Sequence, residues 1–84
     1  MGKVKTAVLA HFTLDEQVIP LRLETEDGAR LKIDRVRDAR PAASLKAGAS
    51  GVRYICDCTA YNDGEEVPVD GLRLFRDDDG WFLE

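Results

Sequence analysis

The strongest constraint on the fold is a period-two alternation of apolar and polar residues that runs through most of the chain. It is clear in residues 4–12, 19–24 and 52–61, where apolar side chains recur at every second position. Several of these side chains are β-branched, which favours an extended backbone. Alternation of this kind is typical of β-strands with one buried face. We therefore expect a strand in each of the three segments.

Turn sequences separate the alternating segments. Asp27-Gly28 lies between two of them, and glycine supplies the positive φ that a tight hairpin requires. Asn62-Asp63-Gly64 and the acidic segment 77–80 are further turns. Shorter extended segments are expected at residues 31–36, 72–76 and 81–83. The sequence thus predicts an all-β fold in one domain, residues 1–84: a small antiparallel barrel or strongly curved meander of five to six strands.

Two irregularities interrupt the alternation. Leu31 and Ile33 are in phase, whereas Val36 is out of phase, so one extra residue is needed to turn Val36 inward. This predicts a β-bulge at residues 34–35. The small-residue segment 39–51 has no alternation, and its proline and glycine suit the start and end of a one-turn helix. We expect a loop there, with such a turn as an option.

The predicted core consists of the apolar side chains on the inward phase of these strands. They are Val8, Ala10, Phe12, Ile19, Leu21, Leu23, Leu31, Ile33, Val36, Tyr54, Cys56, Cys58, Leu72, Leu74, Trp81 and Leu83.

Composition limits the compartment and the ligand. No apolar run approaches the ~20 residues of a membrane span, and the N-terminus lacks the pattern of a secretory signal. We expect a cytoplasmic protein without membrane contact, with both cysteines reduced. The net charge of −4 argues against wrapping a large nucleic acid, although a local basic patch can still touch a few phosphates.

Charge is unevenly distributed along the chain. Residues 30–53 carry seven basic and two acidic side chains, or +5, whereas the rest carries five basic and fourteen acidic ones, or −9. The planar fork of arginine suits phosphate or carboxylate. Tyr54 or Tyr61 can offer a ring to a base, and internal pairing with carboxylates is the alternative. The candidate binding residues are Arg35, Arg37, Arg40, Lys46, Arg53 and Tyr54.

Cys56-Asp57-Cys58 is the other notable cluster. Cysteines two apart on a strand share a face about 6.6 Å apart, which is too far for an undistorted disulfide. A metal site would need further ligands, and His11 is the sole histidine. The face that carries both cysteines is apolar, so we expect core packing, with metal or redox chemistry as the alternative. No motif places a nucleophile beside His11, and we expect neither an enzyme nor a cofactor.

The chain resembles a family of small uncharacterised bacterial β-barrel-like proteins. The resemblance is carried by the Ile-Asp-x-Val strand at residues 33–36, the Arg-Pro-Ala-Ala-Ser-Leu-Lys-Ala-Gly loop at 40–48 and the terminal pair Trp81-Phe82. It covers nearly the whole chain but departs from the family pattern at residues 62–71. No activity follows from it. Similar domains are sometimes encoded near DNA-damage-tolerance polymerases, which implies an accessory role in DNA repair.

These observations predict a non-catalytic interaction module that contacts a protein partner through residues 35–54. One alternative is a nucleic-acid accessory domain that places the same arginines on phosphates of a single strand. The other is a small metal or redox protein built on Cys56 and Cys58.

Overall fold

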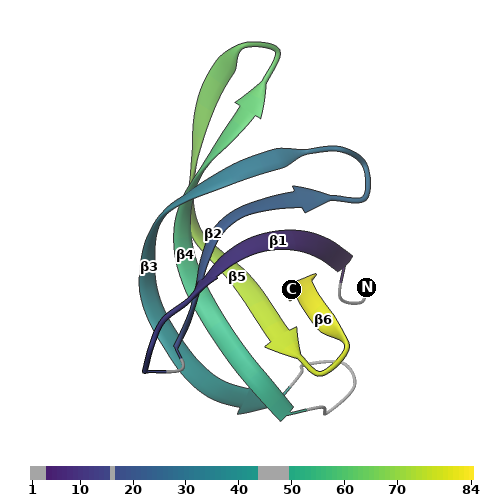
Figure 1. Ribbon diagram of the computed structural model, residues 1–84. Coiled ribbons are helices and arrows are strands. Elements are labelled where there is room, and N and C mark those ends of the chain that lie inside the picture. The colour runs from purple at the N-terminus through teal and green to yellow at the C-terminus, as the bar shows by residue number, and fades with distance from the viewer. Residues whose placement is uncertain (1–3, 16, 44–49) are drawn as a thin grey trace.

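The chain forms six antiparallel strands that close into a barrel (Figure 1). The computed structural model describes residues 4–15, 17–43 and 50–84. Each strand pairs with the next one along the chain, and β6 pairs with β1. The predicted all-β fold is thereby confirmed. Within the described ranges, no helix is long and apolar enough to cross a membrane. The strands are β1 Val4–Phe12, β2 Val18–Thr25, β3 Arg30–Ala43, β4 Ser50–Asn62, β5 Glu65–Asp77 and β6 Gly80–Leu83.

Tight turns set the register of two hairpins. Asp63 and Gly64 both have positive φ, 50° and 83°, and they connect the paired residues Asn62 and Glu65. Two central residues of this kind form the turn whose twist matches that of the flanking strands. Gly28 also has a positive φ, 88°, in the turn between β2 and β3. The turn positions expected from the sequence are therefore confirmed.

The barrel interior holds one apolar core. Its buried members are Leu23, Ile33, Tyr54, Cys56, Cys58 and Leu74. Partly buried side chains pack against them: Val8, Leu31, Val36, Val52, Val69, Leu72, Trp81 and Leu83. Most of the predicted core is confirmed by this cluster.

The predicted core was wrong at the far end of the β1–β2 hairpin. Phe12, Ile19 and Leu21 are exposed, whereas Pro20 is fully buried between them. For Ile19 and Leu21 the cause is an irregularity in pairing, because β2 carries one extra residue, Leu21, opposite β1. Past that residue the inward phase moves to the neighbouring positions. Phe12 keeps its phase on β1 but is the last residue of that strand, next to the β1–β2 turn.

The loop expected at residues 39–51 is shorter than predicted. β3 continues to Ala43 and β4 begins at Ser50, so Pro41 lies within a strand and is paired with Val52. Over this stretch the described residues of β3 pair with β4 alone, and a strand with one open edge tolerates proline. The expected helical turn is therefore absent from the described part of this segment, and its remaining positions lie outside the described ranges.

Bulges on both neighbours of β4 bend the sheet at one level. β3 carries two extra residues relative to β4, Asp34 and Arg37, and the first confirms the predicted bulge. β5 carries Asp70 and Gly71 opposite the single residue Asp57. Extra residues bend a strand and increase its twist. Beyond this level the β4–β5 hairpin projects away from the barrel (Figure 1).

Candidate functional site

Arg37, one of the predicted binding residues, helps to hold this bend. Its Nε donates a hydrogen bond of 2.6 Å to Oδ2 of Asp57, and the backbone N–H of Gly71 donates to the other carboxylate oxygen at 3.2 Å. Burial acts to raise the pKa of Asp57. The hydrogen bonds from Arg37 and Gly71, with the charges of Arg37 and Arg35, outweigh it, so the pKa is lowered. Arg35 itself is exposed and forms no ion pair among the described residues.

Two further predicted arginines have carboxylate partners within the chain. Arg40 Nε lies 2.8 Å from Asp38 Oδ2, and both side chains are exposed to solvent. Such a surface pair contributes little to stability and can exchange for an external anion. Arg53 Nε donates at 2.7 Å to Glu84 Oε1, and the Glu84 side chain is only 3% exposed. Arg53 is therefore committed to a buried ion pair of its own chain.

The remaining predicted residues are a tyrosine and a lysine. Tyr54 is buried in the core, and its ring lies 5.5 Å from that of Trp81 at a tilt of 32°. Its ring is thus shielded from an external base. Lys46 lies outside the described residues. The predicted set therefore divides between surface, core and internal ion pairs, and its role in binding stays a prediction.

Cys56 and Cys58 are free, and both are buried in the core. Burial raises the pKa of Cys56 to about 12 and that of Cys58 to about 11, with smaller contributions from neighbouring charges. Because the thiolate is the nucleophile and the metal ligand, these thiols are inert at neutral pH. Residues 4–15, 17–43 and 50–84 contain no group of three or more His, Cys, Asp or Glu residues arranged to hold a metal ion.

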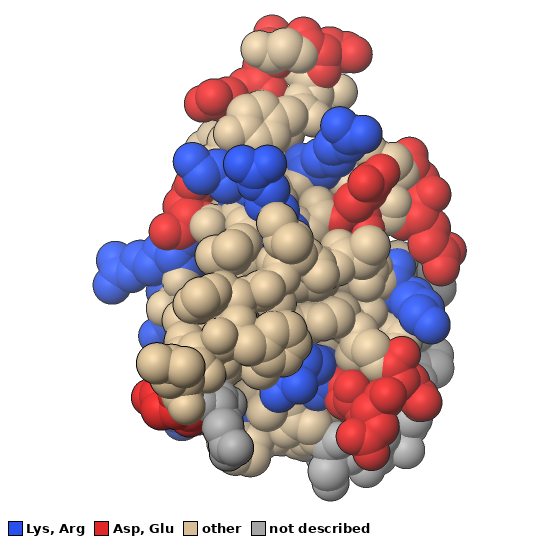
Figure 2. Space-filling model, in the orientation of Figure 1, with Lys and Arg blue, Asp and Glu red and all other residues tan. Residues whose placement is uncertain are grey.

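A groove of about 700 Å³ opens on the outer face of β1, β2 and β3, next to the base of the β4–β5 hairpin. Its apolar lining includes Ala7 and Leu9 of β1, and Tyr61 of β4. Leu9 is 61% exposed and Tyr61 is 48% exposed. Figure 2 shows an uncharged area across this side of the barrel, with basic groups along its upper border. The groove thus combines apolar surface with positive charge.

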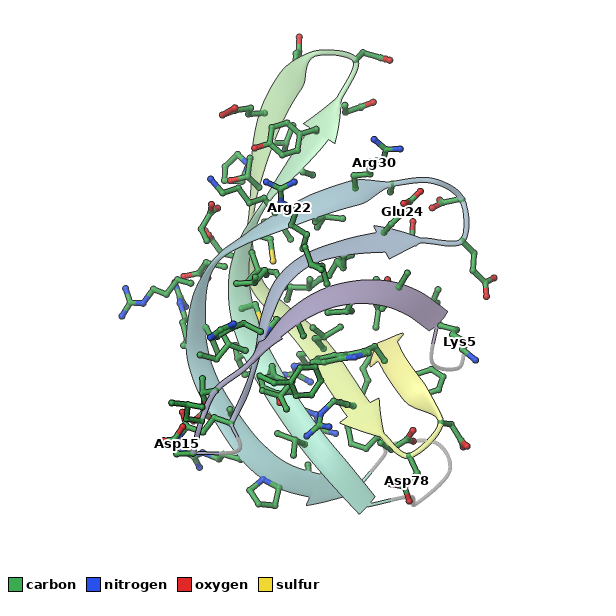
Figure 3. All side chains as sticks on the ribbon, viewed as in Figure 1. Lys5, Asp15, Arg22, Glu24, Arg30 and Asp78 are labelled. Atoms are coloured by element: carbon green, nitrogen blue, oxygen red, sulfur yellow. The ribbon has the colours of Figure 1, made fainter. Side chains whose placement is uncertain are left out.

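The charged lining residues come from two neighbouring strands. Arg22 and Glu24 lie on β2, and Arg30 and Lys32 lie on β3. Figure 3 shows Arg22 and Arg30 rising toward the base of the hairpin, with Glu24 near Arg30. The Nε of Arg30 is 3.9 Å from Oε2 of Glu24, a long contact between exposed groups. Three cations therefore face one carboxylate in this groove.

Strand register arranges the outward-facing lining residues in two rows. Leu9 pairs with Arg22, and Arg22 pairs with Lys32, which forms the first row. The second row runs from Ala7 through Glu24 and Arg30 to Tyr61. In the first row two cations stand directly opposite each other, and neither forms an ion pair with any described residue. Like charges in this position destabilise a sheet.

None of the six binding residues predicted from the sequence is among the described residues that line this groove. Arg30 and Lys32 lie in the basic window of residues 30–53, but Arg22 lies outside it. One available signal was Leu9, a large apolar residue on the outward phase of β1. Tyr61 joins this lining through three successive strand pairings, from β1 to β4, which no local pattern specifies.

Comparison of the chain with protein-family models, with curated proteins and with solved structures finds no match. The resemblance to small bacterial β-barrel-like proteins therefore stays a prediction.

Proposed function

We propose that this protein is a non-catalytic binding module. Its binding surface is the groove on the outer face of β1, β2 and β3. The ligand is a segment of a protein partner that carries both acidic and apolar side chains.

The row that contains Arg22 and Lys32 is the observation that carries this proposal. The two cations face each other across neighbouring strands, and this arrangement costs stability in the free protein. A carboxylate from outside relieves the repulsion and accepts hydrogen bonds from the guanidinium. Surplus positive charge at this position therefore favours an anionic ligand.

Exposed apolar surface beside the cations favours a partner that also brings apolar side chains. Leu9 adjoins Arg22 in the first row, and Tyr61 ends the second. Tyrosine and arginine are enriched at the centres of protein interfaces, where an apolar body and a polar end are used together. A protein segment with alternating acidic and apolar residues matches both properties.

The main alternative is a single strand of nucleic acid with a base on Tyr61 and phosphates on the cations. Acidic groups lie beyond one end of the groove, where β2 and β4 end. Glu26 and Asp27 occupy the β2–β3 turn, and Asp63 and Glu65 occupy the tip of the β4–β5 hairpin. Figure 2 shows acidic groups at the projecting tip and along one side of this face. A polyanion that leaves the groove at this end meets these carboxylates, whereas a short protein segment can end before them.

An NMR titration tests the proposal. The ¹⁵N-labelled protein is titrated at about 50 mM and about 500 mM salt with a blocked peptide of alternating glutamate and valine, with its glutamine counterpart, and with oligothymidylate. We expect the acidic peptide alone to produce saturable shifts at Leu9, Arg22 and Tyr61, weakened by salt. The variant Arg22→Glu/Lys32→Glu should lose this binding, because it removes both cations that contact the carboxylates of the peptide.

The matched control is Arg35→Glu/Arg40→Glu, which makes the same charge change in the region 35–54 predicted from the sequence. Retained peptide binding in this control supports the groove. Loss of binding in the control alone overturns the groove in favour of residues 35–54. Tighter binding of oligothymidylate than of the acidic peptide overturns the protein partner in favour of nucleic acid. Absence of saturable shifts with every ligand overturns the proposal altogether.

A further inference from the structure

The β4–β5 hairpin of this chain has the chemistry expected of the ligand. Residues 60–72 contain four acidic side chains and no basic one. The acidic residues are Asp63, Glu65, Glu66 and Asp70. The same hairpin exposes apolar surface at Val67, which is 45% exposed. Acidic and apolar side chains thus stand together on one projecting element (Figures 1 and 2).

The hairpin is also exposed over its whole outer part. Every residue from Tyr61 to Pro68 is exposed. A two-stranded hairpin is at best marginally stable in water without a third strand or a packed face. The outer part of this hairpin, beyond Arg30 of β3, has no third strand among the described residues. A contact with another surface would stabilise it.

We propose that the partner is a second copy of the chain, with the acidic hairpin of each protomer lying across the groove of the other. The inference rests on the proposed function, because it supplies the ligand for the same groove. Charge complementarity supports it: the groove offers Arg22, Arg30 and Lys32, and the hairpin offers carboxylates without a competing cation. Exposed Leu9 and Val67 supply apolar surface to each side.

Register shows how a two-fold axis brings these groups together. Tyr61 belongs both to the hairpin and to the groove lining. If the axis passes beside Tyr61, the two β4 strands run antiparallel, and residue 61 + n of one protomer is level with residue 61 − n of the other. Asp63 is then level with Thr59 of the second protomer, and Thr59 pairs with Lys32.

The turn of each hairpin therefore falls over the row that contains Arg22 and Lys32, two residues, or about 6.7 Å, from the axis. The two contacts are identical by symmetry, so the assembly closes as a dimer. In the dimer, carboxylates of the second protomer reach Arg22 and Lys32, which form no ion pair with any described residue.

Charge-swapped variants test this arrangement. Arg22→Glu/Lys32→Glu makes the groove acidic. Asp63→Asn/Glu65→Lys/Glu66→Lys leaves Asp70 as the one acidic residue of 60–72 and gives the hairpin a net positive charge. Each variant alone places like charges in both contacts of its dimer, so we expect self-association to weaken at least about tenfold. A mixture of the two variants restores opposite charges in both contacts of a mixed dimer. The measurement is analytical ultracentrifugation from micromolar to millimolar protein, with folding checked by ¹⁵N–¹H spectra.

The expected results are a wild-type dimer that salt weakens, two monomeric variants and a mixed dimer on combination. Arg35→Glu/Arg40→Glu is again the matched control and should dimerise as the wild type does. A wild type that stays monomeric at millimolar concentration overturns the inference, as does a dimer unaffected by the swaps or not restored by mixing. A monomer that still binds the acidic peptide overturns the second copy as partner but leaves the proposed function intact.

Discussion

The ion pair between Arg53 and Glu84 allows a quantitative test of the structure. Its Nε–Oε1 distance is 2.7 Å, and the two side chains are exposed by 23% and 3%. Removing one partner of a buried pair costs about 3–5 kcal/mol, because the other charge stays desolvated. The two ends of this pair differ in burial, so the two single substitutions should differ in cost.

Arg53→Met leaves the more deeply buried carboxylate without its guanidinium, and we expect a loss of about 4 kcal/mol. Glu84→Gln keeps a hydrogen-bond acceptor beside a guanidinium that water partly reaches, and we expect about 2 kcal/mol. The double variant Arg53→Met/Glu84→Met removes both charges and should lie within about 1 kcal/mol of the wild type.

Urea unfolding followed by fluorescence measures these differences, because Trp81 is the only tryptophan and packs against the core. With a slope of about 1 kcal/mol per molar urea, the midpoint falls by about 2 M for Glu84→Gln and about 4 M for Arg53→Met. For a total stability of about 4–13 kcal/mol, the midpoint shift of Glu84→Gln is measurable throughout; at the lower end of this range Arg53→Met is already partly unfolded without urea. Equal losses of stability in the two single variants, or a double variant as unstable as their sum, would contradict a buried ion pair with unequally exposed ends.

Three further predictions concern other parts of the barrel. Gly51→Ala should lower the free energy of unfolding by about 3 kcal/mol, because the added Cβ would lie 2.1 Å from a carbonyl oxygen of β5. Gly28→Ala should lower it by only about 1 kcal/mol, because nothing lies within 4 Å of the added Cβ. Calorimetry of the two variants measures this difference. Asp57 has a lowered pKa, so its contribution to stability is present above its unfolded pKa of about 3.9 and is lost as the pH falls through the folded value. The difference in melting temperature between wild type and Asp57→Asn should therefore shrink on acidification. A difference that grows would contradict the lowered pKa. Cys56 and Cys58 should react with iodoacetamide far more slowly in the native protein than in denaturant, because the pKa values of about 12 and about 11 keep both thiols protonated and burial blocks access; fast native labelling would contradict the buried assignment.

Alternation predicted the strands well because it depends on neighbouring residues alone. It also located the bulge near Asp34, since Val36 could be turned inward only by an extra residue. The second extra residue, Arg37, left no comparable signal. It follows Val36, and the polar segment after it has no phase that could shift. The extra residue Leu21 of β2 was equally hidden, because Ile19, Leu21 and Leu23 are all apolar and fit an unbroken phase.

Phe75 shows a second limit of pattern reasoning. Alternation places it on the face opposite Leu74, in a row with Arg53 and Phe82. It is nevertheless fully buried and lies outside the main core cluster. Periodicity identifies which side chains share a face, but it does not reveal which faces are covered. The buried carboxylate of Glu84 was unpredictable for the same reason, since its partner Arg53 lies 31 residues away.

The basic window of the sequence combines two physical roles that charge alone cannot separate. Arg37 holds Asp57 at the level where bulges on β3 and β5 bend the sheet. This bend directs the β4–β5 hairpin away from the barrel, and the hairpin carries Tyr61 to the edge of the groove. Arg37 therefore acts on the proposed binding surface by positioning it. Arg30 and Lys32, from the same window, line the groove directly because strand register places them beside β2.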